Sequence, residues 1–254
     1  MTAWVDGAIV GDGQVPRRVG VAPFETMGAQ AGAVSLWHLH LARLQRSCER
    51  LVLPFNPPAT LRAGAAELLR SNGHDDGVLR CAVVASAAGT HFVMTSRPRS
   101  PVRIVQLLPT IVQRPVAGPP ADMKAEPRTF YDAVRQQAQD GQADDGVVVD
   151  ADGAVLEASM GNLWFLLDGT WVTPALDGRV LPGIARTLLL AAAHKAGMQV
   201  EQRGCDLGDL HRAEAIAHSN AVYGPRPAAL LLQPAAVARV DSDLLPLWRS
   251  ATAC

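Results

Sequence analysis

The stretch VQRPVAGPPAD, residues 112–122, constrains the fold most, because it holds three prolines and a glycine. Proline cannot donate a backbone hydrogen bond, so such a stretch suits neither a helix interior nor a central strand. We predict that it links an N-terminal α/β domain over residues 1–111 to a C-terminal α/β domain over residues 123–254. A chain of 254 residues has room for two domains, since about 150 residues per domain is typical.

Helical and strand patterns are mixed on both sides of this linker. In HLHLARLQRSCERL, residues 38–51, apolar side chains recur at helical spacing, and Asp6-Gly7 between two apolar runs predicts a hairpin. Further helices are predicted over 57–73, 129–140 and 183–199, and strands over 77–86, 91–96 and 102–108, within 145–174 and within 213–232. This mixture predicts a fold of class α/β or α+β in two lobes.

Composition excludes several classes of protein. Hydrophobic residues make up 48% and charged residues 19% of the chain, and the net charge is -1, so neither disorder nor electrostatic binding of nucleic acid is indicated. No apolar run approaches the roughly 18 to 20 residues of a membrane span, and the start MTAWVDGAIVGDG is unlike a signal peptide, so we expect a cytoplasmic protein. The four separated cysteines, Cys48, Cys81, Cys205 and Cys254, are interpreted as reduced thiols that bind no metal.

Lysine is rare in this chain, which has two lysines against 21 arginines. Lys195 lies near the polar end of a predicted helix and is interpreted as a solvated surface charge. Lys124, in ADMKAEPRTFYD, follows the proline-rich linker. A lysine amine, unlike a guanidinium, can attack a carbonyl and bond to it reversibly. Lys124 is the candidate for that chemistry, although its residue type alone favours a solvated loop lysine.

The motifs that follow Lys124 resemble those of the class IV aminotransferases, the fold type IV pyridoxal-phosphate enzymes. They are GQADDGVVVDADGAVLEASMGNLWF, TPALDGRVLPGIARTLL and SNAVYGPRPA, and upstream FETMGAQAGAVSLWHLHLARLQRSCERL is similar to the family's FET, L, HxxRL, S pattern. The resemblance covers residues 4 to 232. It implies a two-lobed fold with pyridoxal 5'-phosphate between the lobes, a small-molecule amine substrate and a homodimer with residues of both subunits near each site.

Carried over by position, the resemblance assigns Lys124 to the lysine that bonds covalently to the cofactor. An ungapped alignment from Lys124 reaches Asp144-Asp145, which match the family's acidic pair after the first helix. A competing register puts Arg128 at the lysine position, but it needs a deletion of about one helical turn. Glu157 matches the carboxylate that hydrogen-bonds the pyridine nitrogen and keeps the ring electron-accepting.

Three further matches concern the cofactor phosphate. Arg43, in HLARL, corresponds to the family's phosphate-binding arginine, a contact that suits a guanidinium. Ile184 and Ala185 begin a predicted helix, where backbone amides bind phosphate. Asn220 and Ala221 match a second phosphate-binding turn, whereas Asn162 is interpreted as structural.

The segment SNAVYGPRP and the compact length are most similar to the 4-amino-4-deoxychorismate lyase branch, which eliminates pyruvate to give 4-aminobenzoate, a folate precursor. Transfer of an amino group from branched-chain or D-amino acids or from amines is the alternative, and a non-catalytic dimeric binding protein is the second alternative. Thr26, two residues after Phe24 on a predicted strand, either donates a proton to the departing pyruvate oxygen or is structural.

Two departures from the family pattern affect substrate recognition. Pro127 stands where the family often has asparagine, and VLRCAVVASAAG lacks the Arg-Gly pair that holds a substrate carboxylate in several relatives. Arg80, Arg128 and Arg226 are the candidates to replace that pair, and the sequence leaves the choice open.

Overall fold

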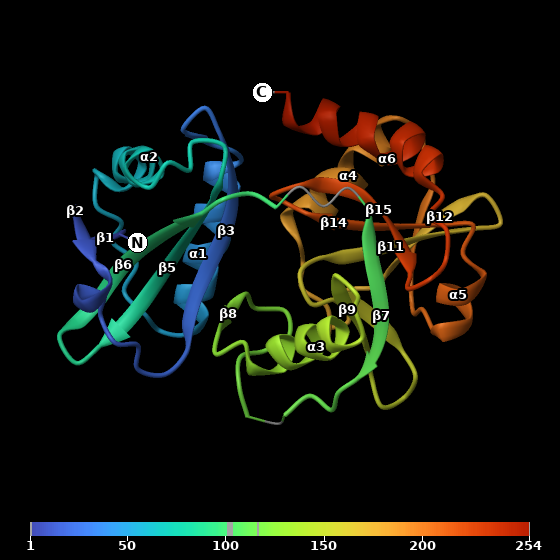
Figure 1. Cartoon of the computed structure of the whole chain (residues 1–254), viewed down its shortest axis with the longest axis horizontal. Helices are drawn as coiled ribbons and strands as arrows, with labels where there is room; N and C mark the ends of the chain where they lie inside the picture. The colour runs from blue at the N-terminus through green and yellow to red at the C-terminus, as the bar shows by residue number, and fades with distance from the viewer. Residues whose placement is uncertain (1, 101–103, 116, 254) are drawn as a thin grey trace. The chain divides into compact units, whose positions relative to one another are not determined.

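The computed structural model describes residues 2–100, 104–115 and 117–253, which form two compact units (Figure 1). The first unit is Met1–Pro101 with Met123–Pro127, and the second is Val102–Asp122 with Arg128–Cys254. The predicted linker at 112–122 therefore differs from the observed division. Strand β7 (Val105–Ile111) is hydrogen-bonded to strands of the second unit, while β8 (Ala125–Glu126) is hydrogen-bonded to β3 (Ala22–Gln30) of the first. Strand pairing, rather than proline content, decides to which unit each segment belongs.

The first unit is built on one sheet with strand order β2-β1-β6-β5-β3-β4, with β8 added to β3. The predicted hairpin is confirmed: Asp6 and Gly7 have φ values of 47° and 119°, and their turn pairs Val5 with Ala8. Positive φ at both turn positions is typical of an Asp-Gly hairpin. The remaining bounds are β1 Thr2–Val5, β2 Ala8–Gly11, η1 Asp12–Gln14, β4 Ala33–Val34, β5 Val78–Ser86 and β6 Gly89–Arg97.

Two helices cover one face of this sheet, α1 (Trp37–Arg50) and α2 (Leu61–Ser71), as the apolar spacing predicts (Figure 1). Their buried side chains pack against alternate residues of β3 and β5, including Met27 and Leu79. Gly64 lies inside α2 because Trp4 packs there: a Cβ on Gly64 would lie 2.1 Å from the Trp4 Nε1. The opposite face carries Phe24, Ala82 and other residues of the alternate set, so β3 presents different side chains to its two sides.

The second unit contains a longer sheet with strand order β10-β9-β7-β15-β14-β11-β12-β13. Its strands run antiparallel except for the parallel pairs β12–β13, β15–β7 and β7–β9. Their bounds are β9 Asp145–Val149, β10 Val155–Ala158, β11 Asn162–Leu167, β12 Thr170–Pro174, β13 Val200–Arg203, β14 Ala215–Asn220 and β15 Gly224–Leu230. The parallel pairs join segments far apart in the chain, which local patterns do not reveal.

Helices pack against both faces of this second sheet. Helices α4 (Ile184–Lys195) and α6 (Val237–Thr252) pack around Trp164 and Trp171, and α5 (Leu207–Arg212) packs on the other face. Helix α3 (Thr129–Asp140) ends at Gly141, as predicted. Helix α6, which has Pro246 inside it, was not predicted from the sequence.

Three of the four cysteines lie in the core. Cys48, Cys81 and Cys205 are buried thiols, and burial raises the pKa of Cys48 and Cys81 to about 12. Cys254 lies outside the described residues. Within the described ranges, no helix is both long and apolar enough to span a membrane.

Candidate active site

Lys124 lies in the first unit, where its backbone extends the edge of β3. The Phe24 amide donates to the Lys124 carbonyl at 2.9 Å, so the segment before β8 is fixed against the strand that carries Phe24. The Lys124 Nζ lies 4.8 Å from the centre of the Phe24 ring, a cation–π distance. Strand pairing therefore fixes the backbone from which this half-buried side chain extends.

The Phe24 ring also brings Arg80 into the neighbourhood of Lys124. The Arg80 guanidinium carbon lies 4.0 Å from the centre of the same ring, and its NH2 donates to Glu126 at 2.8 Å. Thr26 is paired with Arg80 across β3 and β5 and is half-buried. Since side chains two apart on a strand share a face, Thr26 follows Phe24 on the side where Lys124 lies.

Arg43 lies on α1, where it forms a buried ion pair with Glu25 of the FET motif. Its Nε and NH2 donate to the two Glu25 oxygens at 2.7 and 2.6 Å, and His40 Nδ1 is 2.7 Å from Oε2. Burial would raise the pKa of Glu25, but the charge and hydrogen bonds of Arg43, together with His40, lower it to about 2. Burial lowers the pKa of His40, so at neutral pH this histidine donates to Glu25 as a neutral ring. Arg43 is thus held in one orientation.

Glu157 lies on β10 in the second unit and is 3% exposed. The Tyr131 hydroxyl donates to Oε1 at 2.6 Å, while the Leu181 amide and the Asn162 Nδ2 donate to Oε2 at 3.1 and 3.4 Å. Arg114 NH2 donates to the Tyr131 oxygen at 3.2 Å. Burial and the nearby Glu157 raise the pKa of Tyr131, so it remains a protonated donor. Hydrogen bonds of this kind favour the ionised form of a carboxyl group.

The turn before α4 is built around the Asn162 amide. Asn162 Nδ2 donates to the Leu181 carbonyl at 2.9 Å, and a Cβ on Gly183 would lie 2.0 Å from Asn162 Oδ1. Glycine is therefore required at the N-cap of the helix that Ile184 and Ala185 begin. The interpretation of Asn162 as structural agrees with these contacts. The start of α4 is also tied to the sheet, because the Arg186 NH2 donates to the Pro174 carbonyl at 3.0 Å.

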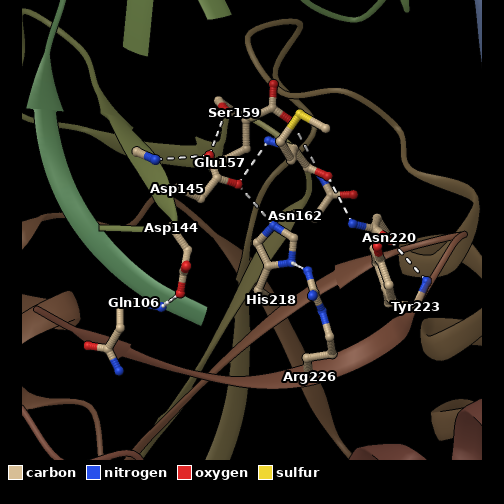
Figure 2. A network of polar contacts seen from close by, with 12 residues as sticks. Gln106, Asp144, Asp145, Glu157, Ser159, Asn162, His218, Asn220, Tyr223 and Arg226 are labelled. Carbon is tan, nitrogen blue, oxygen red and sulfur yellow. Dashed lines mark hydrogen bonds and ion pairs between the residues drawn. The ribbon is translucent and has the colours of Figure 1, made fainter. Parts of the chain in front are cut away.

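Asn220 ends β14 and shapes the turn that contains Ala221. Its Oδ1 accepts from the amides of Val222 and Tyr223, both at 3.1 Å, and its Nδ2 donates to the Met160 carbonyl at 3.1 Å (Figure 2). The turn is thereby connected to the segment that follows Glu157. Arg128 contributes to the same segment, since its NH2 donates to the Ser159 carbonyl at 2.9 Å.

These groups fit pyridoxal phosphate by their chemistry. The first unit offers a lysine amine and an oriented guanidinium, and the second offers a buried carboxylate, a helix start preceded by an obligatory glycine and a turn shaped by an asparagine. Sequence reasoning missed four residues that hold these groups: Glu25, His40, Arg114 and Tyr131. Glu25 was visible in the FET motif, but its contact with α1 requires the packing of the helix on the sheet.

Comparisons with known proteins agree with this fold. The family model described as "Amino-transferase class IV" matches residues 22–231. The structure is similar to that of a 4-amino-4-deoxychorismate lyase from Pseudomonas aeruginosa, with a TM-score of 0.79 and 26% identity, covering 98% of each chain. The predicted fold class, a mixed α/β fold of type IV, is confirmed.

Curated relatives carry a different name. A Thermotoga maritima protein named "Probable branched-chain-amino-acid aminotransferase" is 24% identical over 218 residues, which cover 80% of this chain and 76% of that protein. A Staphylococcus epidermidis protein of the same name is 35% identical over 77 residues, which cover 30% of this chain and 22% of that protein. The chain therefore matches about a fifth of the length of this last relative.

Proposed function

This chain belongs to the class IV aminotransferases, a family of pyridoxal-phosphate enzymes, and we propose that it is a 4-amino-4-deoxychorismate lyase. The reaction eliminates pyruvate from the substrate and leaves 4-aminobenzoate. The position of Thr26 on the Phe24 and Lys124 side of β3 carries the proposal. A lyase needs a proton donor for the departing oxygen in addition to the amine, and a hydroxyl about 7 Å along the strand from Phe24 suits that task.

Each residue of the proposed site has its own role in this reaction. Pyridoxal phosphate, when bound, supplies an electron-accepting ring that stabilises negative charge on the carbon next to the substrate amine. Lys124 would take the proton from that carbon; Thr26 would give its hydroxyl proton to the ether oxygen as the bond to the ring breaks and would recover a proton from the Lys124 ammonium. Glu157 holds the ring nitrogen protonated. Arg43, the amides of Ile184 and Ala185, and the Asn220-Ala221 turn bind the phosphate.

Arg80 is our choice for binding a substrate carboxylate. Its guanidinium shares the Phe24 ring with the Lys124 amine, both within the first unit. The other two candidates have contacts that assign them elsewhere: Arg128 donates to the Ser159 carbonyl, and Arg226 lies over Tyr223 at 4.2 Å and beside His218. The pair of Arg80 with Glu126 orients the guanidinium, and a substrate carboxylate would compete with Glu126 for it.

Amino-group transfer is the second candidate, favoured by the name of the Thermotoga maritima relative. Both activities use Lys124, Glu157 and the phosphate-binding groups, so the residues that hold the cofactor do not separate them. They differ in what leaves the site. A transferase returns a keto acid from an amino donor, whereas the lyase releases pyruvate and 4-aminobenzoate from one substrate.

A product assay tests the proposal. Purified protein is supplied with pyridoxal phosphate and 4-amino-4-deoxychorismate, and 4-aminobenzoate and pyruvate are measured. In a parallel reaction it is supplied with 2-oxoglutarate and a branched-chain or D-amino acid. The lyase proposal requires equal amounts of the first two products. A new keto acid in the second reaction, with neither product in the first, would establish the transferase instead. Thr26→Val should slow pyruvate release while the cofactor stays bound.

The homodimer and the cytoplasmic location remain predictions. Light scattering of the purified protein measures the first, and a mass of about twice 26.9 kDa is expected.

A further inference from the structure

The buried carboxylate of Asp145 has no task in the proposed reaction, yet it lies between the segment after Glu157 and the Asn220 turn (Figure 2). Asp145, the first residue of β9, is 3% exposed. Its Oδ1 accepts from the Ser159 hydroxyl at 2.5 Å and from the Gly146 amide at 2.9 Å. Its Oδ2 accepts from the Met160 amide at 3.1 Å and lies 3.2 Å from His218 Nε2. One side chain thus fixes the two residues that come two and three positions after Glu157.

The hydrogen-bonding pattern around His218 determines which ring nitrogen carries the proton. His218 is fully buried, and its Nδ1 lies 3.4 Å from the Arg226 NH2. A guanidinium can only donate, so Nδ1 must accept and the proton is assigned to Nε2. That proton is then donated to Asp145. Burial lowers the pKa of Arg226 without removing its charge, so the neutral ring bridges a cation and an anion.

The Met160 peptide joins this network to the Asn220 turn. Its N–H donates to Asp145, and its carbonyl accepts from Asn220 Nδ2 at 3.1 Å. The next residue, Gly161, packs so closely on β14 that a Cβ would lie 2.5 Å from the Ser219 carbonyl oxygen and 2.7 Å from the His218 ring. The turn after Glu157 and the turn at Asn220-Ala221 therefore cannot shift independently of each other or of His218.

We propose that Asp145 and His218 are positioning residues that set the distance between Glu157 and the Asn220-Ala221 turn. This inference rests on the proposed function, in which these two groups hold the ring nitrogen and the phosphate of one cofactor molecule. The two ends of pyridoxal phosphate are joined covalently, so an error in spacing weakens both contacts at once. Asp145 and His218 need not touch the cofactor to have this effect.

Four variants of the full-length protein, loaded with pyridoxal phosphate, test the inference. Asp145→Asn removes the negative charge with little change in shape. His218→Leu removes the donor to Asp145, and His218→Gln restores an N–H donor at that place. Asp144→Asn is the matched control, because Asp144 is the exposed neighbour and its Oδ2 accepts from the Gln106 amide, away from both turns (Figure 2). The readouts are the dissociation constant of pyridoxal phosphate, the position of its near-visible absorption band and the melting temperature.

We expect Asp145→Asn and His218→Leu to bind pyridoxal phosphate about tenfold to hundredfold more weakly, the usual effect of losing a charged hydrogen bond. The absorption band should shift in the direction that Glu157→Gln shifts it. His218→Gln should recover part of both changes, and Asp144→Asn should match the wild type. If Asp145→Asn does not fold, the two His218 variants decide the question.

Two results would overturn the inference. In the first, folded Asp145→Asn and His218→Leu proteins keep wild-type affinity and spectrum, whatever their melting temperature. In the second, Asp144→Asn changes the cofactor as much as Asp145→Asn does. Failure of the proposed function looks different: a wild-type protein that binds pyridoxal phosphate but releases no 4-aminobenzoate and pyruvate refutes the lyase, whereas the cofactor affinities of the Asp145 and His218 variants still decide this inference.

Discussion

Glu25→Gln should show how strongly the buried pair with Arg43 stabilises the fold. Glu25 is 1% exposed, and the variant leaves a guanidinium that is 11% exposed without its carboxylate. Burial raises the pKa of Glu25, but Arg43 and His40 more than compensate and bring it from 4.5 to about 2. That lowering corresponds to about 3 kcal/mol of unfolding free energy at neutral pH, at about 1.4 kcal/mol per pKa unit. We expect the variant to be less stable by this amount at pH 7.

The stability difference between the wild type and Glu25→Gln should also depend on pH, in a direction set by the pKa of Glu25. Because folding depresses the pKa of Glu25, its contribution is complete above the unfolded value of 4.5 and is lost as the pH falls through the folded value of about 2. The difference between wild type and Glu25→Gln should therefore shrink between about pH 5 and pH 2. Urea unfolding at several pH values measures it.

Glu49→Gln, on the exposed side of α1, is the control and should change stability by less than about 0.5 kcal/mol. The contribution of His40 does not cancel in this comparison, because Glu25 raises the pKa of His40 in the wild type and Glu25→Gln removes that effect. Protonation of His40 on acidification therefore weakens the variant more than the wild type. A difference below about 1 kcal/mol at pH 7, or one that does not change with pH, would refute the reasoning.

Three further variants probe the rest of the site. Tyr131→Phe removes the 2.6 Å hydrogen bond to Glu157. The variant should lower the unfolding free energy by about 1.5 to 3 kcal/mol and weaken cofactor binding in a titration. Unchanged values of both quantities would show that this hydrogen bond does not hold Glu157. Gly183→Ala should lower the unfolding free energy by about 1 to 3 kcal/mol, because the new Cβ meets Asn162. Gly204→Ala is the control, since Gly204 has open space around it and the variant should keep its stability. Equal melting temperatures of the two variants would contradict the close approach at Gly183. Arg80→Gln should raise the KM for the substrate about tenfold and leave kcat nearly unchanged. Arg70→Gln, at an exposed arginine, is the control. A fall in kcat alone would show that Arg80 does not bind the substrate.

Periodic segments of the fold could be predicted because their signals are local. The spacing of Leu41, Leu44 and Cys48 marks α1, and Asp6-Gly7 marks the first hairpin. The sheet to which β7 belongs could not be predicted, because β7 joins it by parallel pairing with β9 and β15, and β15 lies more than a hundred residues later. Helix α6 was missed because Pro246 is a signal against a helix, although it is tolerated there.

In the candidate site too, residues in local motifs could be predicted, whereas their contact partners could not. Lys124, Glu157 and Arg43 are single residues in recognisable motifs, so their positions could be named from the sequence. Their partners could not, because each contact depends on tertiary packing. His218 meets Asp145 across 73 residues, and Tyr131 meets Glu157 across 26. Arg128 is an example. It lies four residues after Lys124, so a competing alignment placed it at the lysine position, whereas in the structure it donates a hydrogen bond to the Ser159 carbonyl.

The covalent attachment of the cofactor tests the account most directly. Protein incubated with pyridoxal phosphate is reduced with borohydride, and the intact mass and the modified peptide are measured. The account predicts one added cofactor per chain, on Lys124, which is lost in Lys124→Arg and retained in Lys195→Arg. The two lysines form a matched pair, since Lys195 is exposed at the end of α4. A wild-type protein with no added mass, or with the cofactor on Lys195, would contradict the account.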